Sequence, residues 1–188
     1  KVNWIKDDSE NNKKVVICHS LGIHLIGKEI LREASHIVLI NSFYNFIPSN
    51  NESKITMRTL LRMEKKINSG EVRFMLEEFI SRSFMPNQVD IKFKSIFNLK
   101  SKQINLKNLL KDFQKLYLQK STFSLFSKNT DILVIKSKND LILKDYASDE
   151  FVYLLNNSQI NKPKLVQIEG QGHLIDNSCI VKILKDWL

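Results

Sequence analysis

Short runs of apolar, β-branched residues alternate with helical patterns at both ends of this chain, and this alternation restricts the fold more than any other feature. Residues 14–18 read KVVIC and residues 36–41 read HIVLIN, and the segment between them has apolar positions at helix-like spacing. A strand that is buried on both faces is apolar throughout, as these two runs are. The pattern predicts a βαβ unit, in which parallel strands are joined by a right-handed crossover.

The same alternation returns near the carboxyl terminus. Residues 131–137 and 164–170 have the apolar character of buried strands, and helical patterns follow them at 145–156 and 178–188. Strands that alternate with helices indicate an α/β fold with a parallel sheet. We therefore expect one sheet that is built from both ends of the chain.

The middle of the chain has a different pattern. Three segments read as amphipathic helices: 57–67, 72–84 and 104–118. No strand alternation is visible between them, so the segment predicts an all-helical insertion. We divide the chain into a core made of residues 1–46 and 129–188 and a helical insertion at 47–128.

The net charge of the chain is +9, and the excess lies in its middle. Residues 51–128 contain 16 Lys and Arg against 7 Asp and Glu, whereas the other residues contain 13 of each. Such a patch attracts acidic partners over a distance, although a lysine-rich solvated surface explains the same composition. No zinc-finger spacing, RNP-like aromatic motif or basic-zipper pattern is present, so we do not expect nucleic acid to be the partner.

Composition argues against several other classes of protein. No apolar run approaches the length that spans a bilayer, so no membrane association is expected. Cys18 and Cys179 have neither a metal-binding spacing nor the pattern of a disulfide framework, and no other ligand cluster predicts a metal or a cofactor. Without a secretion signal at the start of the chain, a reducing cytoplasm is the expected location.

Three polar residues follow the ends of three predicted strands. Ser20 follows VVICH, Asp140 follows ILVIKSKN and His173 follows LVQIEGQG. Ligands of open parallel sheets collect at the carboxyl ends of the strands. A serine becomes a nucleophile when a histidine takes its proton, and an acid holds that histidine in the required tautomer. The chain order Ser…Asp…His therefore predicts a catalytic triad of Ser20, Asp140 and His173.

The residues around Ser20 suit a sharp turn from strand to helix. Such a turn strains the backbone of the nucleophile and brings the residues two before and two after it close together, so both must be small. Gly22 and Cys18 occupy these positions. The turn also aims the backbone amide of Leu21 toward a developing oxyanion.

Each triad residue also has a structural interpretation. A serine before a helix is most often an N-cap, an aspartate can begin a turn, and a histidine after two glycines can be a loop residue. The shared order and the three strand ends favour Ser20, Asp140 and His173 as a triad over these separate explanations.

The remaining polar candidates have structural interpretations too. His19 points off the turn, His36 begins its strand at the far end of the sheet, and Cys18 lies inside a strand end. His24 can line the site, although packing explains it as well. Asp176 reads as the cap of the last helix.

The strings VVICHSLG, DILVIKSKNDLIL and VQIEGQGHLI resemble the nucleophile, acid and histidine segments of the α/β-hydrolase superfamily, with 47–128 in the place of its helical cap. The longer strings VVICHSLGIHLI and ASHIVLINSFYNFIPS resemble, more specifically, the pimeloyl-[acyl-carrier protein] methyl ester esterases of biotin synthesis in their divergent cyanobacterial form. The resemblance implies a serine carboxylesterase that hydrolyses the methyl ester of a pimeloyl chain on acyl carrier protein through an acyl-enzyme on Ser20.

The resemblance also implies roles for the helical insertion. Acyl carrier protein is strongly acidic, and the basic insertion is its expected counterpart. Arginine forks suit phosphate, and the candidate contacts with the carrier or its phosphopantetheine are Arg58, Arg62, Arg73 and Arg82. The candidate lining of an acyl channel, which helical packing explains equally well, is Phe74, Met75 and Phe79.

The chain departs from the superfamily pattern in two places. Cys18 stands where a glycine is usual. The superfamily also has four strands before the nucleophile strand and a His-Gly loop that supplies a second oxyanion amide, and residues 1–13 are too few to contain them. We therefore expect a fragment without the N-terminal strands, with an unpaired edge on strand 15–19 and one oxyanion donor.

Three classes of function remain open at this point. The first is an ester hydrolase that acts on a carrier protein. The second is another α/β-hydrolase, such as a small-molecule esterase, a lipase-like enzyme or a thioesterase. The third is a hydrolase-like binding protein without catalysis.

Overall fold

Four parallel strands form the sheet in a computed structural model of the chain, which describes residues 13–47, 49–118 and 126–188. The strands lie in the order of the chain: β1 (Val15–His19), β2 (His36–Ile40), β3 (Asp131–Ser137) and β4 (Lys164–Ile168). Each strand pairs in parallel with the next one, so every connection is a crossover. The parallel sheet that the alternation predicts is confirmed.

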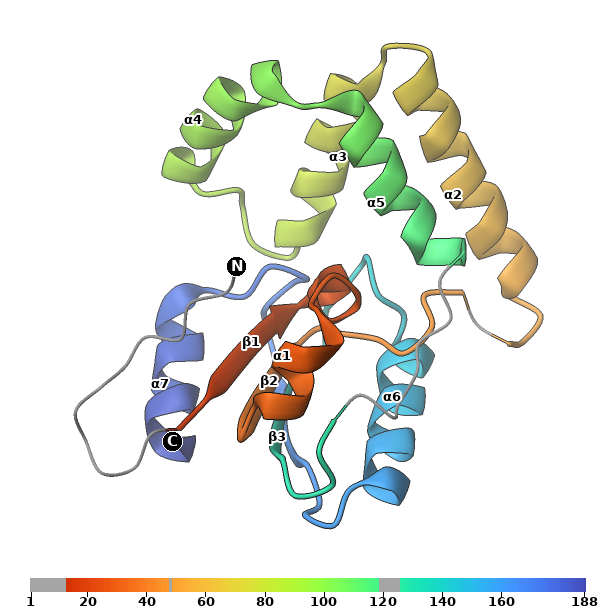
Figure 1. Cartoon of the computed structure of the whole chain (residues 1–188). Helices are drawn as coiled ribbons and strands as arrows, with labels where there is room; N and C mark the ends of the chain where they lie inside the picture. The colour runs from red at the N-terminus through yellow and green to blue at the C-terminus, as the bar shows by residue number, and fades with distance from the viewer. Residues whose placement is uncertain (1–12, 48, 119–125) are drawn as a thin grey trace.

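Helices cover both faces of this sheet (Figure 1). On one face, α1 (Lys28–Glu33) and α6 (Asp145–Ser158) pack over an apolar cluster that includes Leu31, Leu39 and Phe151. On the other face, α7 (Asn177–Trp187) packs over the alternate residues of β2 and β3. Because both faces are buried, the central strands are apolar at nearly every position, as their sequences are.

A group of helices lies over the carboxyl ends of the strands (Figure 1). It consists of α2 (Ser53–Asn68), α3 (Val72–Phe84), α4 (Ile91–Lys100), the 3₁₀ turn η2 (Ser101–Gln103) and α5 (Leu106–Leu118). Leu60, Ile67, Met75 and Phe113 form the buried centre of this group, which has a core of its own. The described helices of the predicted insertion therefore stand above the edge of the sheet where ligands are expected.

The helical pattern after β1 is interrupted, in contrast to the continuous helix that the spacing of residues 21–34 predicts. A 3₁₀ turn, η1 (Ser20–His24), follows β1, and α1 begins only at Lys28. Gly27 is extended, with φ −63° and ψ 141°, and it caps α1. The apolar positions before Gly27 therefore belong to η1 and the residues just after it, and those after Gly27 belong to α1, although their spacing resembles that of a single helix.

The first strand lies at the edge of the described sheet. β1 pairs only with β2 among the described residues, and the Ile17 side chain is 52% exposed. The unpaired edge expected on residues 15–19 is confirmed for this part of the chain. The segment 1–12, on which the expectation about preceding strands depends, lies outside the described residues.

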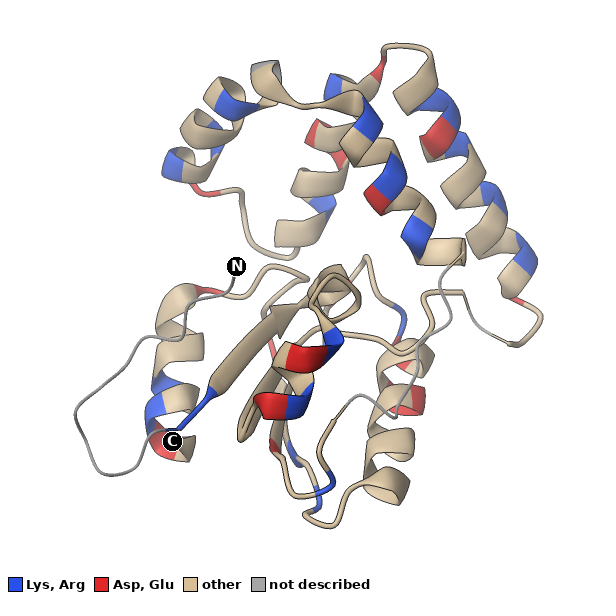
Figure 2. Cartoon of the chain, in the orientation of Figure 1, with Lys and Arg blue, Asp and Glu red and all other residues tan. Residues whose placement is uncertain are grey.

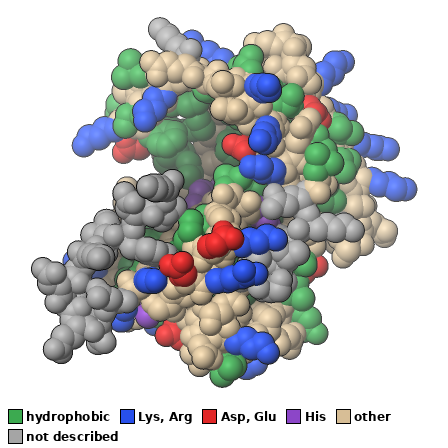
Figure 3. Space-filling view, viewed as in Figure 1, with side chains coloured by type: hydrophobic (Ala, Val, Ile, Leu, Met, Phe, Trp, Pro, Cys, Tyr) green, Lys and Arg blue, Asp and Glu red, His purple; other side chains and the backbone are tan. Residues whose placement is uncertain are grey.

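Basic side chains are distributed over the helical group. Figure 2 marks Lys and Arg positions along α2, α4 and α5, and Figure 3 shows basic side chains projecting from the helical group and hydrophobic side chains around a hollow between α4 and α3. Within the described ranges, no helix combines the length and apolar character required to cross a membrane. The same ranges hold no group of three His, Cys, Asp or Glu side chains arranged to bind a metal ion.

Candidate active site

Ser20 sits on a sharp turn between β1 and η1. Its φ is +53°, in the left-handed region, and among the described non-glycine residues it shares a positive φ only with Asn41. A β-carbon built on Gly22 would lie 3.8 Å from the Cys18 β-carbon, which is ordinary contact. The residues two before and two after Ser20 therefore do come close together, and the Cys18 side chain fits beside Gly22.

Asp140 and His173 are joined by a hydrogen bond in a buried environment. His173 Nδ1 donates to Asp140 Oδ2 at 2.6 Å, and the two side chains are 3% and 5% exposed. The other oxygen, Asp140 Oδ1, accepts from the backbone amides of Ile142 and Leu143 at 2.7 and 2.8 Å. Asp140 therefore both begins a turn and holds the imidazole, and the turn fixes the direction of the carboxylate.

The contact between the strand end that carries Ser20 and the Asp140–His173 pair is made by His19, the residue before Ser20. Among the described residues, no hydrogen bond joins Ser20 to His173, and such catalytic bonds are often long without substrate. The ring of His19 lies 4.8 Å from the ring of His173, between centroids. The structure therefore brings Asp140 and His173 into direct contact and places the strand end that carries Ser20 beside them. The roles of the three residues as a triad remain a prediction.

Asn41 is a site residue that the sequence reasoning missed. Its Nδ2 donates to the carbonyl of His173 at 2.8 Å and to Ser137 Oγ at 3.0 Å, while its Oδ1 accepts from the Ser137 amide at 2.7 Å. Asn41 is 2% exposed and has a φ of +42°. Its position in the sequence could have indicated a site residue, because a polar residue directly after the apolar run HIVLI lies at the same sheet edge as Ser20.

The other histidines and Cys18 have structural surroundings. His24 stacks on Phe43, and its Nε2 donates to the Phe43 carbonyl at 3.0 Å. His36 lies edge-on to Trp187 at the start of β2, away from Ser20. Burial raises the pKa of Cys18 to about 12, so its thiol stays protonated at neutral pH and is a poor nucleophile.

The loop that carries His173 is also held by the end of α3. The amide of Leu174 donates to the carbonyl of Ser83 at 2.9 Å. Asn87 Nδ2 donates to the carbonyl of Gly170 at 2.9 Å. A β-carbon on Gly172 would lie 2.2 Å from the Met85 carbonyl oxygen, so this position requires a glycine. The helical group thus contacts the histidine loop directly.

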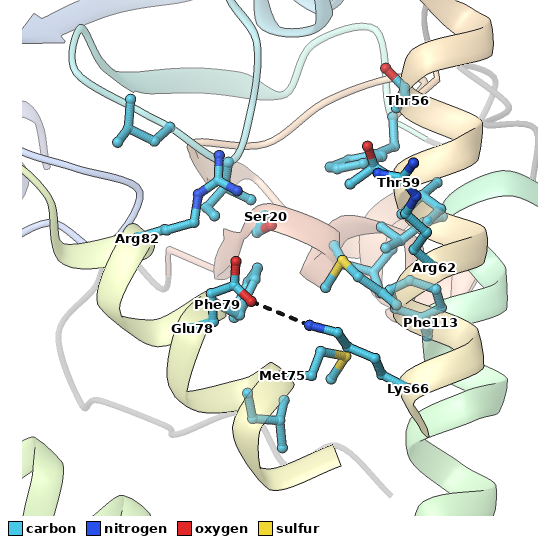
Figure 4. Close-up of a pocket in the computed structure, with 18 of the residues that line it drawn as sticks. Ser20, Thr56, Thr59, Arg62, Lys66, Met75, Glu78, Phe79, Arg82 and Phe113 are labelled. Atoms are coloured by element: carbon cyan, nitrogen blue, oxygen red, sulfur yellow. Dashed lines mark ion pairs between the residues drawn. The ribbon is translucent and has the colours of Figure 1, made fainter. Parts of the chain in front are cut away.

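A cavity of about 640 Å³ opens between Ser20 and the helical group (Figure 4). Leu21 and Ser20 form part of its lining, and most of the remaining wall is apolar, contributed by α2, α3 and α5. An ion pair between Lys66 and Glu78, 3.5 Å long, lies on this wall. The cavity places Ser20 against an apolar space that is large enough for an acyl chain.

The predicted arginine contacts separate into two pairs. Arg62 and Arg82 line the cavity, as Figure 4 shows, and neither has an ion-pair partner among the described residues. Arg58 and Arg73 are not part of the lining, and Arg73 instead pairs with Glu77 on its own helix at 2.9 Å.

Of the three predicted acyl-channel residues, two line the cavity and one does not. Met75 and Phe79 line the cavity. Phe74 is 63% exposed and is not part of the lining, so the expectation that it faces an acyl channel is wrong. Phe74 lies one residue before Met75 on α3, which turns its side chain to another face of the helix.

Several solved structures share the fold of this chain. The chain is similar to a bromoperoxidase from Bacillus anthracis, with a TM-score of 0.67, 16% identity and 92% of this chain covered. It is also similar to an esterase from Exiguobacterium antarcticum, with a TM-score of 0.67, 14% identity and 90% covered. A third similar structure is an α/β-hydrolase fold protein from Burkholderia ambifaria, with a TM-score of 0.54, 13% identity and 93% covered.

These similarities establish the fold as that of the α/β-hydrolases. The chain spans 67%, 63% and 64% of the three neighbours, which is about two thirds of their length. No family model matches the sequence, and no curated protein matches it. At identities this low, the similarity describes the fold, and the activity is argued from the site itself.

Proposed function

We propose that this chain carries the catalytic site of a serine ester hydrolase. The observation that carries the proposal is the buried 2.6 Å hydrogen bond between His173 and Asp140, at the sheet edge where Ser20 occupies a strained turn. A nucleophile, a base and an orienting acid on three strand ends are the groups that acyl transfer from an ester requires. The similar structure from Exiguobacterium antarcticum is an esterase, which agrees with this class.

The reaction follows from these groups in two halves. His173 Nε2 takes the proton of Ser20 as the hydroxyl oxygen attacks the ester carbonyl, and the Leu21 amide donates to the resulting oxyanion. Collapse of this intermediate transfers the proton from His173 to the leaving alcohol and leaves an acyl-enzyme on Ser20. Water then attacks with His173 as base, and the acid is released while Ser20 regains its proton.

For the substrate, we propose the methyl ester of a pimeloyl chain that is attached to acyl carrier protein. The resemblance of the nucleophile segment suggests this substrate, and two features of the structure support it. The cavity beside Ser20 has a mainly apolar wall that suits an acyl chain. Arg62 and Arg82 line the same cavity without ion-pair partners among the described residues, and they suit the phosphate of a carrier's prosthetic group.

Covalent labelling tests the catalytic proposal. A fluorophosphonate reacts with activated serines, and we expect it to modify Ser20 in the intact protein and not in the Ser20→Ala variant. Replacement of the exposed Ser69, which lies at the end of α2, is the matched control and leaves labelling unchanged. Absence of an adduct on Ser20 would favour a hydrolase-like binding protein instead.

Paired substrates test the proposed carrier. We expect Arg62→Ala and Arg82→Ala to lower kcat/KM for the carrier-linked methyl ester more than for a free methyl ester. Arg73→Ala is the control, because its guanidinium is paired on the surface of α3. Equal effects on the two substrates would identify a small-molecule esterase, and a stronger effect of Arg73→Ala would place the carrier elsewhere.

A further inference from the structure

We propose that His19 is a positioning residue for His173, and that it acts on the main chain of the histidine loop rather than on the substrate. This inference rests on the proposed hydrolase function, in which His173 is the base. His19 is the last residue of β1 and directly precedes Ser20. Through His19, the strand end that presents the nucleophile also fixes the loop that presents the base.

The contact between the two histidines has two parts. His19 Nε2 lies 2.9 Å from the backbone carbonyl oxygen of His173. Because a carbonyl only accepts hydrogen bonds, His19 must carry its proton on Nε2 and donate it. The two rings also pack against each other, with centroids 4.8 Å apart and planes inclined by 50°. His19 thus restrains both the backbone and the imidazole of His173.

The carbonyl of His173 receives a second donor from the neighbouring strand. Asn41 Nδ2, at the end of β2, donates to the same oxygen at 2.8 Å. Two side chains from adjacent strand ends therefore hold one carbonyl, and a carbonyl oxygen has two lone pairs to accept them. Asn41 also bonds to Ser137, so its replacement would disturb β3 as well. His19 is the member of this clamp that can be changed with the least effect elsewhere.

The surroundings of His19 disfavour its charged form. Burial and the nearby His173 lower the pKa of His19, and they outweigh the bond to the His173 carbonyl and the charge of Asp140, which raise it. A neutral His19 adds no positive charge next to the imidazolium that forms on His173 during acyl transfer. The neutral ring can therefore stay in place through the reaction and keep its single Nε2 donor.

Two amide substitutions separate positioning from simple packing. His19→Gln carries an N–H at about the reach of the imidazole Nε2, whereas His19→Asn has the same polarity and ends one bond short. We expect His19→Asn to lower kcat by up to about 100-fold with KM little changed, because a misplaced base slows the chemical step. We expect His19→Gln to recover most of this loss. His24→Asn is the control, since His24 makes a similar bond to a carbonyl outside the histidine loop.

A spectroscopic readout makes the test independent of turnover. The proton shared by His173 Nδ1 and Asp140 Oδ2 should give a low-field NMR signal in the original protein and in His19→Gln, and a weakened or exchange-broadened signal in His19→Asn. An unchanged signal and kcat in a folded His19→Asn variant would overturn the positioning role, as would equal losses in the Asn and Gln variants. If the protein shows the signal but hydrolyses no ester, the proposed function is overturned. The NMR comparison of the His19 variants would then still test whether His19 positions His173.

Discussion

The two carboxylate oxygens of Asp140 have different hydrogen-bond partners. One oxygen accepts the two backbone amides of the turn that follows, and the other accepts the His173 imidazole. The structure therefore contains both the turn that the structural interpretation predicts and a bond from Asp140 to His173, while the catalytic role of Asp140 stays a prediction. The turn orients the carboxylate before any substrate binds, which is the kind of preorganisation that acid–base catalysis requires.

Replacing Asp140 with asparagine tests the proposed role of its carboxylate in orienting His173 and stabilising the imidazolium. Asparagine keeps a carbonyl oxygen for the turn amides, but it removes the charge that stabilises the His173 imidazolium and favours the wrong tautomer. We expect Asp140→Asn to lower kcat by about 10⁴-fold while the free energy of unfolding changes little. Steady-state kinetics with thermal unfolding measures both quantities. Retention of kcat within about tenfold would show that another group supports the histidine.

At the scale of elements, α3 connects the cavity to the histidine loop. Met75 and Phe79, on its earlier turns, line the cavity, and Ser83, near its end, accepts the amide of Leu174. Ser83 is fully buried in this contact, and its own hydroxyl donates to the carbonyl of Phe79. One helix therefore forms part of the cavity wall beside Ser20 and also contacts the loop that carries His173.

The close approach at Gly172 predicts the effect of adding a single methyl group. In Gly172→Ala, the new β-carbon would collide with the carbonyl oxygens of Met85 and Ser83, 2.2 and 2.6 Å away, and α3 would have to separate from the loop. We expect the free energy of unfolding to fall by about 1–3 kcal/mol and the Leu174 amide to lose protection from hydrogen exchange.

The control is the same change at a glycine with more room. In Gly22→Ala, the added β-carbon makes an ordinary 3.8 Å contact with Cys18, so the Leu174 amide should stay protected. Protection that survives in Gly172→Ala would mean that the loop and α3 are held together by other contacts.

Across the whole molecule, the charge and the candidate chemistry lie in different halves. Lys and Arg are concentrated on the helical group (Figure 2). Ser20, Asp140 and His173 lie beneath it, in the turns that follow strands of the sheet. In the function proposed above, the basic helical group attracts an acidic carrier protein electrostatically, and the groups proposed to react lie beneath it at the edge of the sheet.

Ionic strength should therefore affect two substrates differently. For an ester carried on an acidic protein, we expect kcat/KM to fall steeply as salt rises from 0.01 M to 0.15 M, because the Debye length shortens from about 30 Å to about 8 Å. For a short neutral methyl ester, the same change should alter kcat/KM by less than about twofold, since no long-range attraction is involved. Equal salt responses would refute docking by the basic half.

Local patterns predict the elements that have a clear apolar run or a single apolar stripe. β3 has an apolar centre at 132–135 and is predicted at its observed bounds, 131–137, and the amphipathic α3 is predicted at its observed bounds, 72–84. In contrast, α4 was missed because its apolar residues form no single stripe and none of its side chains is buried. The predicted helix over 21–34 was wrong at Gly27, where the extended backbone interrupts a periodicity that continues across it.

The sequence alone determined which groups stand at the carboxyl ends of the strands, because a parallel sheet brings all these ends to one edge. Ser20, Asp140 and His173 could be proposed on that basis. Only the tertiary structure decided that His19 and Asn41 hold the His173 carbonyl, because such bonds join residues more than 130 positions apart and leave no periodic trace in the sequence. The physical reason is that the positions of strands and helices in the sequence follow local hydrophobic patterns, whereas side-chain contacts depend on how the finished elements pack.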